Sequence, residues 1–159
     1  MATANPYAAP TARVADAAEA APPLWNPNAA ASWSLLFTPA FGAYLHMLNW
    51  RELGDERQAA AAKGWFSASL AVLGAYIALA VAVPDFDARY IGLAYLLTWY
   101  FAAARGQARY VKEKYGNDYP RKGWGKALLL AVAAFVGYFF VAVLVGAAAA
   151  AAGWITPTP

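Results

Sequence analysis

The fold of this chain is constrained most strongly by two long stretches that contain no charged residue. Residues 64–83 (GWFSASLAVLGAYIALAVAV) form one of 20 residues, and residues 127–155 form another of 29. An α-helix rises about 1.5 Å per residue, so about 20 apolar residues cross the roughly 30 Å hydrocarbon layer of a bilayer. We therefore predict membrane-spanning helices at residues 64–83 and at about 127–150.

The composition favours lipid over water as the surroundings of this chain. Hydrophobic residues make up 62% of the 159 residues and charged residues 13%, against about 45–50% and about 25% in an ordinary soluble domain. A single domain of this length has too little interior to bury so much apolar surface. The expected fold class is an all-α integral membrane protein.

A third apolar stretch is shorter. Residues 90–104 (YIGLAYLLTWYFAAA) are 15 uncharged residues between Arg89 and Arg105. Arginine side chains can run along the lipid and place their guanidinium groups among the headgroups. We predict a third span here.

A fourth uncharged stretch, residues 29–50, carries polar and small residues at helical spacing. They form a predicted packing stripe of Ser34, Thr38, Gly42, His46 and Asn49. Small residues let helices approach closely, and polar ones hydrogen-bond between helices. Pro39 interrupts the helical hydrogen bonding, which leaves two interpretations: a kinked full span, or a re-entrant or interfacial hairpin broken at Thr38-Pro39.

The two ends of the chain differ from this single helical membrane domain of residues 29–155. Residues 1–28 are rich in Ala and Pro, and prolines break regular elements. We predict a flexible tail over residues 1–28 and a short tail over residues 156–159.

The charged loops indicate how the chain threads the membrane. Residues 105–126 hold seven basic and two acidic residues, and residues 51–63 hold three of each. Basic loops stay on the cytoplasmic side, so four spans place both loops inside a bacterial inner (cytoplasmic) membrane. A re-entrant first segment would change only the side of the N-terminal tail.

The two inner loops also resemble each other in sequence. One reads LGDERQAAAAKGWFSASL and the other YGNDYPRKGWGKALL, each with KGW directly before an apolar stretch. A tandem pair of helical hairpins would explain the likeness. Convergence would explain it too, because any helix that starts at the inner face favours a Lys, a Gly and an interfacial Trp.

The segment WSLLFTPAFGAYLHMLNW, followed by a short charged loop and KGW before a second span, resembles small bacterial inner-membrane proteins of unknown function. The resemblance covers about residues 30–140. It implies a membrane location and transfers no catalytic residue.

Basic and aromatic residues at the predicted inner face suit the headgroup region of a bilayer. Anionic lipid headgroups are the expected partners of Arg105, Arg109, Lys112, Lys114, Arg121, Lys122 and Lys126. The expected interfacial anchors are Trp50, Trp65 and Trp124, because indole rings favour the headgroup level. A juxtamembrane setting does not favour nucleic acid as a partner of these basic residues.

Few residues suggest chemistry. The chain has no cysteine and one histidine, His46, so neither a metal site nor a haem site is expected. The carboxylates lie in the loops among basic residues, as on a solvated surface. We expect no enzyme activity and no cofactor.

The function that the sequence favours is structural. The small-residue stripes indicate an accessory, scaffold or assembly subunit that packs against a membrane-protein partner or a second copy. The alternative is a small-solute transporter or channel component in which Ser34, Thr38, His46 and Asn49 line a path.

Overall fold

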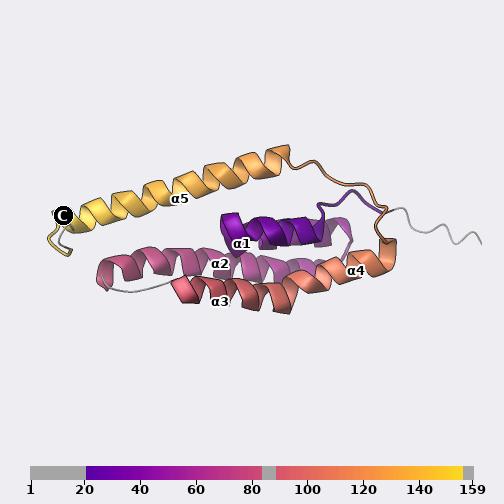
Figure 1. Ribbon diagram of the computed structural model, residues 1–159, viewed down its shortest axis with the longest axis horizontal. Coiled ribbons are helices and arrows are strands. Elements are labelled where there is room, and N and C mark those ends of the chain that lie inside the picture. Colours follow the sequence, from indigo (N-terminus) through magenta and orange to yellow (C-terminus); the bar gives the residue numbers. More distant parts are fainter. Residues whose placement is uncertain (1–20, 84–88, 156–159) are drawn as a thin grey trace, which may run out of the picture.

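The computed structural model describes residues 21–83 and 89–155, and their regular structure is helical (Figure 1). In chain order the helices are α1 (Pro27–Glu52), α2 (Glu56–Ala82), α3 (Arg89–Trp99), the π-helical segment η1 (Tyr100–Ala104), α4 (Arg105–Tyr115) and α5 (Gly125–Ala151). Within these described ranges the only β-pairing is one isolated bridge. The predicted all-α class is confirmed.

Two helices extend beyond their predicted boundaries. The segments α3, η1 and α4 follow one another without a gap, so residues 89–115 form one rod (Figure 1). Helix α2 begins at Glu56, where the Asp55 side chain accepts a hydrogen bond from the Gln58 amide at 2.9 Å. Most of the predicted loop 51–63, and residues 105–115 of the predicted loop 105–126, are therefore helical. Their polar residues are good helix formers with a cap, and apolarity alone does not mark where such a helix ends.

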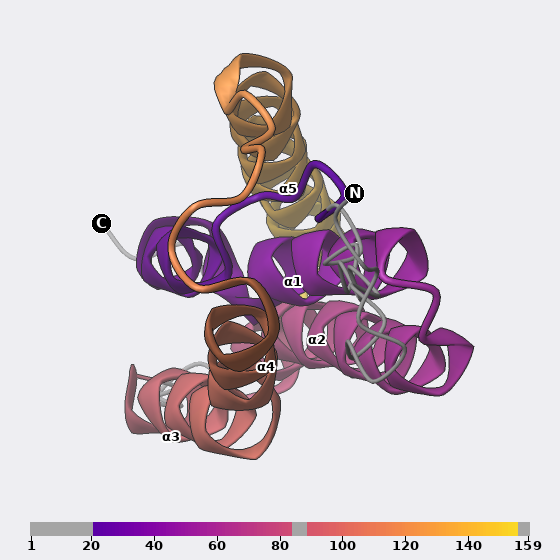
Figure 2. The same cartoon turned by 90° about the vertical axis from the view of Figure 1, so that its right-hand side faces the viewer.

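Helix α1 folds back on itself. The backbone leaves the helical conformation at Phe37 (φ −106°, ψ 16°) and Thr38 (φ 69°, ψ 162°). The two arms on either side, residues 27–36 and 39–52, lie side by side in Figure 2. The His46 Nε2 atom lies 3.2 Å from the Pro27 carbonyl oxygen, whereas 19 residues of straight helix would span about 28 Å. Of the two interpretations left open, the hairpin broken at Thr38-Pro39 is the one found, and the single kinked helix is not.

Local chemistry and packing together place the break. A residue before proline is disfavoured in the helical region, and proline lacks the amide hydrogen that would continue the helix. On the opposite arm, a Cβ on Gly42 would overlap Ser34 Oγ and the Trp99 ring, whose Cζ2 would lie 2.9 Å away. The missing side chain at Gly42 therefore lets the two arms and α3 meet.

Replacing Thr38 by glycine is expected to raise the free energy of unfolding by about 1 kcal/mol. A β-branched residue at φ 69° and ψ 162° is strained, and glycine adopts these angles freely. Thr98→Gly is the matched control, because Thr98 is exposed inside the continuous rod and its replacement should cost a few tenths of a kcal/mol. Thermal unfolding in detergent measures both, and destabilisation by Thr38→Gly would mean that α1 is one continuous helix.

Residues 21–28 do not form the predicted tail. Leu24 is fully buried and pairs with the α4–α5 connection, donating its amide to the Pro120 carbonyl at 3.0 Å and accepting from the Lys122 amide at 2.9 Å. Helix α1 already starts at Pro27, with Asn26 as its cap. Pro22 and Pro23 disfavour a helix before Asn26, but they allow the extended backbone that pairs at Leu24. The amino-acid composition of the segment does not reveal this pairing. The remaining predicted tail residues, 1–20 and 156–159, lie outside the described residues.

The two halves of the chain differ where a tandem repeat would make them alike. The segments before the two loops also resemble each other, with Leu36, Thr38 and Phe41 matching Leu96, Thr98 and Phe101. Thr38 lies at the hairpin break, whereas Thr98 lies inside the rod and donates to the Ala94 carbonyl as in a regular helix. The similarity of the two loops around KGW is therefore not accompanied by a matching pair of hairpins.

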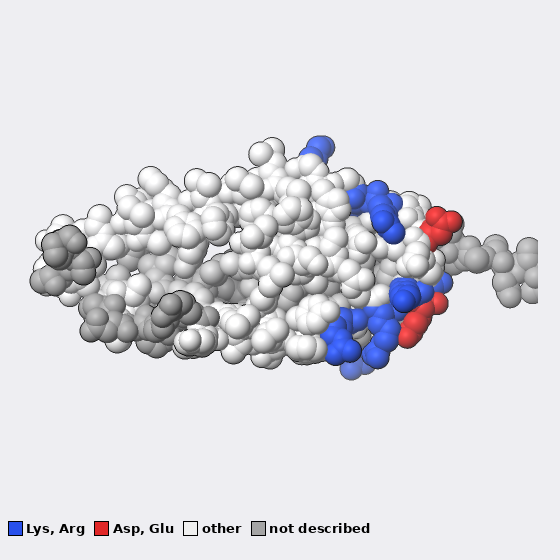
Figure 3. All heavy atoms as spheres, viewed as in Figure 1, with Lys and Arg blue, Asp and Glu red and all other residues white. Residues whose placement is uncertain are grey.

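Helix α5 lies along the outside of the bundle, against α1 and α2 (Figures 1 and 2). Phe135 meets Phe37 edge-on with ring centroids 6.2 Å apart, and the Tyr138 hydroxyl donates to the Leu73 carbonyl at 3.3 Å. Among the described residues, α2 and α5 are the two helices long and apolar enough to cross a membrane. Lys, Arg, Asp and Glu gather at one end of the face seen in Figure 3, away from the apolar body.

Candidate functional site

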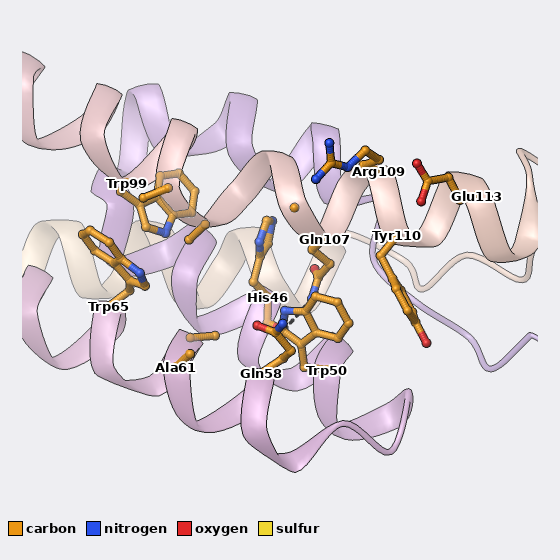
Figure 4. Close-up of a pocket in the computed structure, with 14 residues that line it drawn as sticks. His46, Trp50, Gln58, Ala61, Trp65, Trp99, Gln107, Arg109, Tyr110 and Glu113 are labelled. Carbon is orange, nitrogen blue, oxygen red and sulfur yellow. Dashed lines mark hydrogen bonds between the residues drawn. The ribbon is translucent and has the colours of Figure 1, made fainter.

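A cavity of about 360 Å³ lies between the second arm of α1, the first half of α2, and the rod from η1 into α4 (Figure 4). Its lining comprises His46, Trp50, Gln58, Ala61, Ala62, Trp65, Trp99, Ala102, Ala103, Gly106, Gln107, Arg109, Tyr110 and Glu113. Three helical segments that are far apart in the sequence therefore line the cavity together.

Small residues and an irregular turn create this space. Ala61 and Ala62 on α2 face Ala102, Ala103 and Gly106 on the rod across the cavity. Residues 100–104 form a π-helical turn, which adds a residue to the turn and is frequent at functional sites. Where these small residues lie opposite one another, the two helices leave a gap between them.

A buried amide pair holds the base of the cavity together. The Gln107 side chain, fully buried, donates to the His46 carbonyl at 2.8 Å. The Asn49 side chain, also fully buried, donates to Gln107 Oε1 at 3.2 Å. Together with the His46 contact to Pro27, these bonds fix α4 against both arms of the hairpin.

The same asparagine anchors the N-terminal segment. Asn49 Nδ2 donates to the Trp25 carbonyl at 2.8 Å, and Asn49 Oδ1 accepts from the Trp25 amide at 3.0 Å. The Lys122 ammonium lies 4.5 Å from the centre of the Trp25 ring and 2.6 Å from Glu52 Oε1. The start of α1 is therefore at the charged end of the molecule, beside the α4–α5 connection.

The polarity of the cavity changes along its length. Trp65 and Trp99 lie at one end in Figure 4, while Arg109, Tyr110 and Glu113 lie at the other. Arg109 and Glu113 are exposed and make no ion pair within 4.0 Å with any described residue. One end of the cavity can thus hold apolar groups and the other can bind both signs of charge.

The predicted packing stripe is placed inside the hairpin, and its members do not share one channel. Ser34, Gly42, His46 and Asn49 are buried, and Ser34 donates to the Ala30 carbonyl at 2.9 Å. Ser34 and Thr38 border a second, mostly apolar cavity of about 530 Å³ at the hairpin tip, whereas His46 borders the first. In this arrangement the stripe holds the two arms together.

The predicted headgroup-binding residues lie around the charged end. Arg105, Arg109, Lys112, Lys114, Arg121 and Lys126 are exposed, and Lys122 is half-buried. Arg121 lies over the Tyr119 ring, 5.5 Å from its centre. Burial raises the pKa of the Tyr119 hydroxyl above its usual value, and the positive charge of Arg121 lowers it in part.

The three predicted tryptophan anchors have different surroundings. Trp50 is buried, with its ring centroid 5.0 Å from that of Tyr110. Trp65 borders the cavity, and Trp124 packs against the cluster of Ala30, Leu45 and Ala127.

Among residues 21–83 and 89–155, no three His, Asp or Glu side chains come close enough to hold a metal ion. The arrangement offers aromatic faces, amides and one charge of each sign. Those groups suit the binding of an amphipathic molecule.

Sequence reasoning predicted Arg109 as a headgroup contact but missed Gln107, Glu113 and the N-terminal segment. Gln107 is the one uncharged amide in the basic stretch of α4, and Glu113 its one acid. Both break the local pattern, which is the only signal the sequence gives. Trp99 packs on Gly42, a helix contact that a mid-span tryptophan suggests.

Comparisons of this chain with models of protein families, with curated proteins and with solved structures find no match.

Proposed function

We propose that this protein is a small, non-catalytic accessory or assembly subunit of a membrane complex, embedded in a bacterial inner membrane. One observation carries the proposal. Helices α2 and α5 each have 27 residues, yet only 6% of the most apolar 18-residue stretch of each helix is buried inside the protein. The core helix of a soluble protein would be mostly buried. Lipid or partner helices must therefore cover this surface.

The proposed threading has three crossings and one hairpin. Helix α2, α3 with η1, and α5 cross the bilayer, α4 continues the rod on the charged side, and the α1 hairpin enters and leaves on that side. A backbone break at membrane depth is tolerated where protein covers it; Pro39 and Gly42 beside this break are buried. The charged end then faces the cytoplasm, with residues 21–26, 51–63 and 105–126 inside.

Single-cysteine labelling tests this threading, since the natural chain has no cysteine. We expect a membrane-impermeant maleimide to label Thr158→Cys in intact spheroplasts. Asn5→Cys and Asn117→Cys should be labelled only after lysis. A full span at α1 would instead expose the Asn5→Cys variant to the outside reagent, so labelling there before lysis would contradict the hairpin arrangement.

Helix α5 is the proposed docking surface for a partner helix. It packs on α1 and α2 along one side only, and its outer side chains are largely exposed, with Leu129 at 70%, Phe140 at 64% and Val143 at 67%. Van der Waals packing drives helix association in lipid, and among the described helices α5 carries the most large exposed apolar side chains.

A photo-crosslinking amino acid at Val143 is expected to give a protein adduct in cells. At Leu70 on α2, 49% exposed, the matched variant should give lipid adducts only. Mass spectrometry of the products identifies both. Lipid adducts alone at both positions would contradict the partner, and adducts with neither lipid nor protein would contradict the membrane location.

The basic end supports a second contact, with anionic headgroups, worth about 1 kcal/mol for each basic side chain near the surface. The transporter alternative gains no support from the site. Ser34, His46 and Asn49 direct hydrogen bonds to backbone groups within the protein.

A further inference from the structure

We infer that the cavity between α1, α2 and the η1–α4 rod is a binding site for one zwitterionic phospholipid, with a phosphate and an ammonium in its headgroup. The inference rests on the proposed membrane location and adds a specific ligand to it. Three features of the cavity support this ligand: its pair of charges, its aromatic wall, and its open flank.

The pair of charges selects a ligand that carries both signs. Arg109 and Glu113 are four residues apart on α4, so both project from the same side of the helix. A lone anion at Arg109 would meet the carboxylate of Glu113, and a lone cation would meet the guanidinium. A headgroup whose phosphate and ammonium are joined by a two-carbon linker satisfies both, with the phosphate on Arg109 and the ammonium on Glu113.

The aromatic wall favours the cationic part of that headgroup. Trp50 and Tyr110 lie against each other, 5.0 Å between ring centroids, and both border the cavity. The faces of such rings attract ammonium groups. Gln58 on α2 offers a further donor and acceptor at the same polar end.

The open flank gives the acyl chains a way out. Ala61 on α2 and Ala102 and Gly106 on the rod border the cavity and are all exposed. No bulky side chain at these positions closes the gap between the helices. Deeper in, Trp65 and Trp99 supply an apolar end, so the change in polarity along the cavity follows that of a phospholipid from headgroup to chain (Figure 4). The volume of about 360 Å³ lies within the range of small-molecule sites.

Native mass spectrometry of the delipidated full-length protein in detergent tests the inference. The probes are phosphatidylethanolamine and phosphatidylglycerol with identical acyl chains, offered in equal amounts. We expect the wild-type protein to retain one phosphatidylethanolamine with a preference of about tenfold, the effect of one added charge-assisted hydrogen bond. Equal retention of the two lipids would overturn the inference, and this comparison needs no variant.

Three variants assign the contacts. Glu113→Gln should abolish the preference by weakening phosphatidylethanolamine alone, whereas Arg109→Gln should weaken both lipids, because both carry a phosphate. Arg57→Gln, an exposed charge outside the cavity, is the matched control and should change neither. A preference that survives both cavity variants would overturn the assignment.

Soluble phosphoethanolamine separates a lipid from a free headgroup as the ligand. At equal concentration it should not displace the bound lipid, because it lacks the chains that the apolar end holds; displacement would overturn the lipid assignment. Failure of the proposed function looks different. A protein outside the membrane would dissolve without detergent and carry no lipid from the cell, whereas failure of this inference leaves lipids bound without headgroup preference.

Discussion

Replacing Gly42 by alanine is expected to lower the free energy of unfolding by about 1–3 kcal/mol, the cost of overpacking a filled core. The new Cβ would overlap Ser34 Oγ on the other arm of the hairpin and the Trp99 ring on α3, with Cζ2 at 2.9 Å. Trp99 is 1% exposed, so its ring could move away from the new methyl group only into the cavity that it borders. A larger residue, as in Gly42→Leu, should open the hairpin.

Gly74→Ala is the matched control for this substitution. Gly74 lies mid-helix on α2 with no atom within 4 Å of a Cβ placed there. Alanine favours helix over glycine by about 1 kcal/mol, so this variant should be as stable as the natural protein or more so. Thermal unfolding followed by circular dichroism in detergent compares them. Equal effects of the two substitutions would contradict the packing of α1 against α3.

Replacing Asn49 by aspartate is expected to destabilise the fold by about 3–5 kcal/mol, as for an uncompensated buried charge. The two side chains have nearly the same shape, but a carboxylate cannot donate the bonds that Asn49 gives to the Trp25 carbonyl and Gln107 Oε1. It would place negative charge beside two oxygen atoms at a position that is fully buried. The N-terminal segment and α4 should both detach from α1.

The loss of stability in the Asn49→Asp variant should be smaller at low pH, because a protonated carboxyl group can again donate one of the two hydrogen bonds. Asn117→Asp is the control: Asn117 is exposed in the turn after α4, and its substitution should change stability by less than about 0.5 kcal/mol. Protease sensitivity of residues 21–27, together with thermal unfolding, measures the effect. An Asn49→Asp variant as stable as the Asn117→Asp variant would show that the buried amide pair does not hold these elements together.

These expectations separate what local sequence can predict from what it cannot. The apolar stretches at residues 64–83 and 127–150 predict helices correctly, because hydropathy and helix length are properties of the stretch itself. Helix ends were predicted less well. Residues 56–63 and 105–115 are polar yet helical, since a capped polar segment continues a helix for reasons unrelated to membrane crossing.

The candidate site was the least predictable part. His46 was noticed because it is the one histidine, but its partner is the carbonyl of Pro27 on the opposite arm. Gln107 reaches Asn49 across 58 residues of sequence, and its being the one uncharged amide in a basic stretch does not identify that partner. The sequence predicts Arg109 as a contact to lipid headgroups and does not single out Glu113, and the structure places both beside aromatic residues at the polar end of a cavity.

The sequence by itself determined that this protein is helical, that two of its helices are long and apolar enough to cross a membrane, and that the apolar stretches at residues 64–83 and 127–155 carry no charge. Those features follow from the polarity of consecutive residues. The tertiary structure decided that α1 turns back at Thr38, that Leu24 joins the charged end, and that a cavity opens beside the π-helical turn. Each of these is completed by contacts between residues far apart in the chain, above all Gly42 against Trp99. Helical spacing marks Gly42 as a packing position, but it does not identify the residue that packs there.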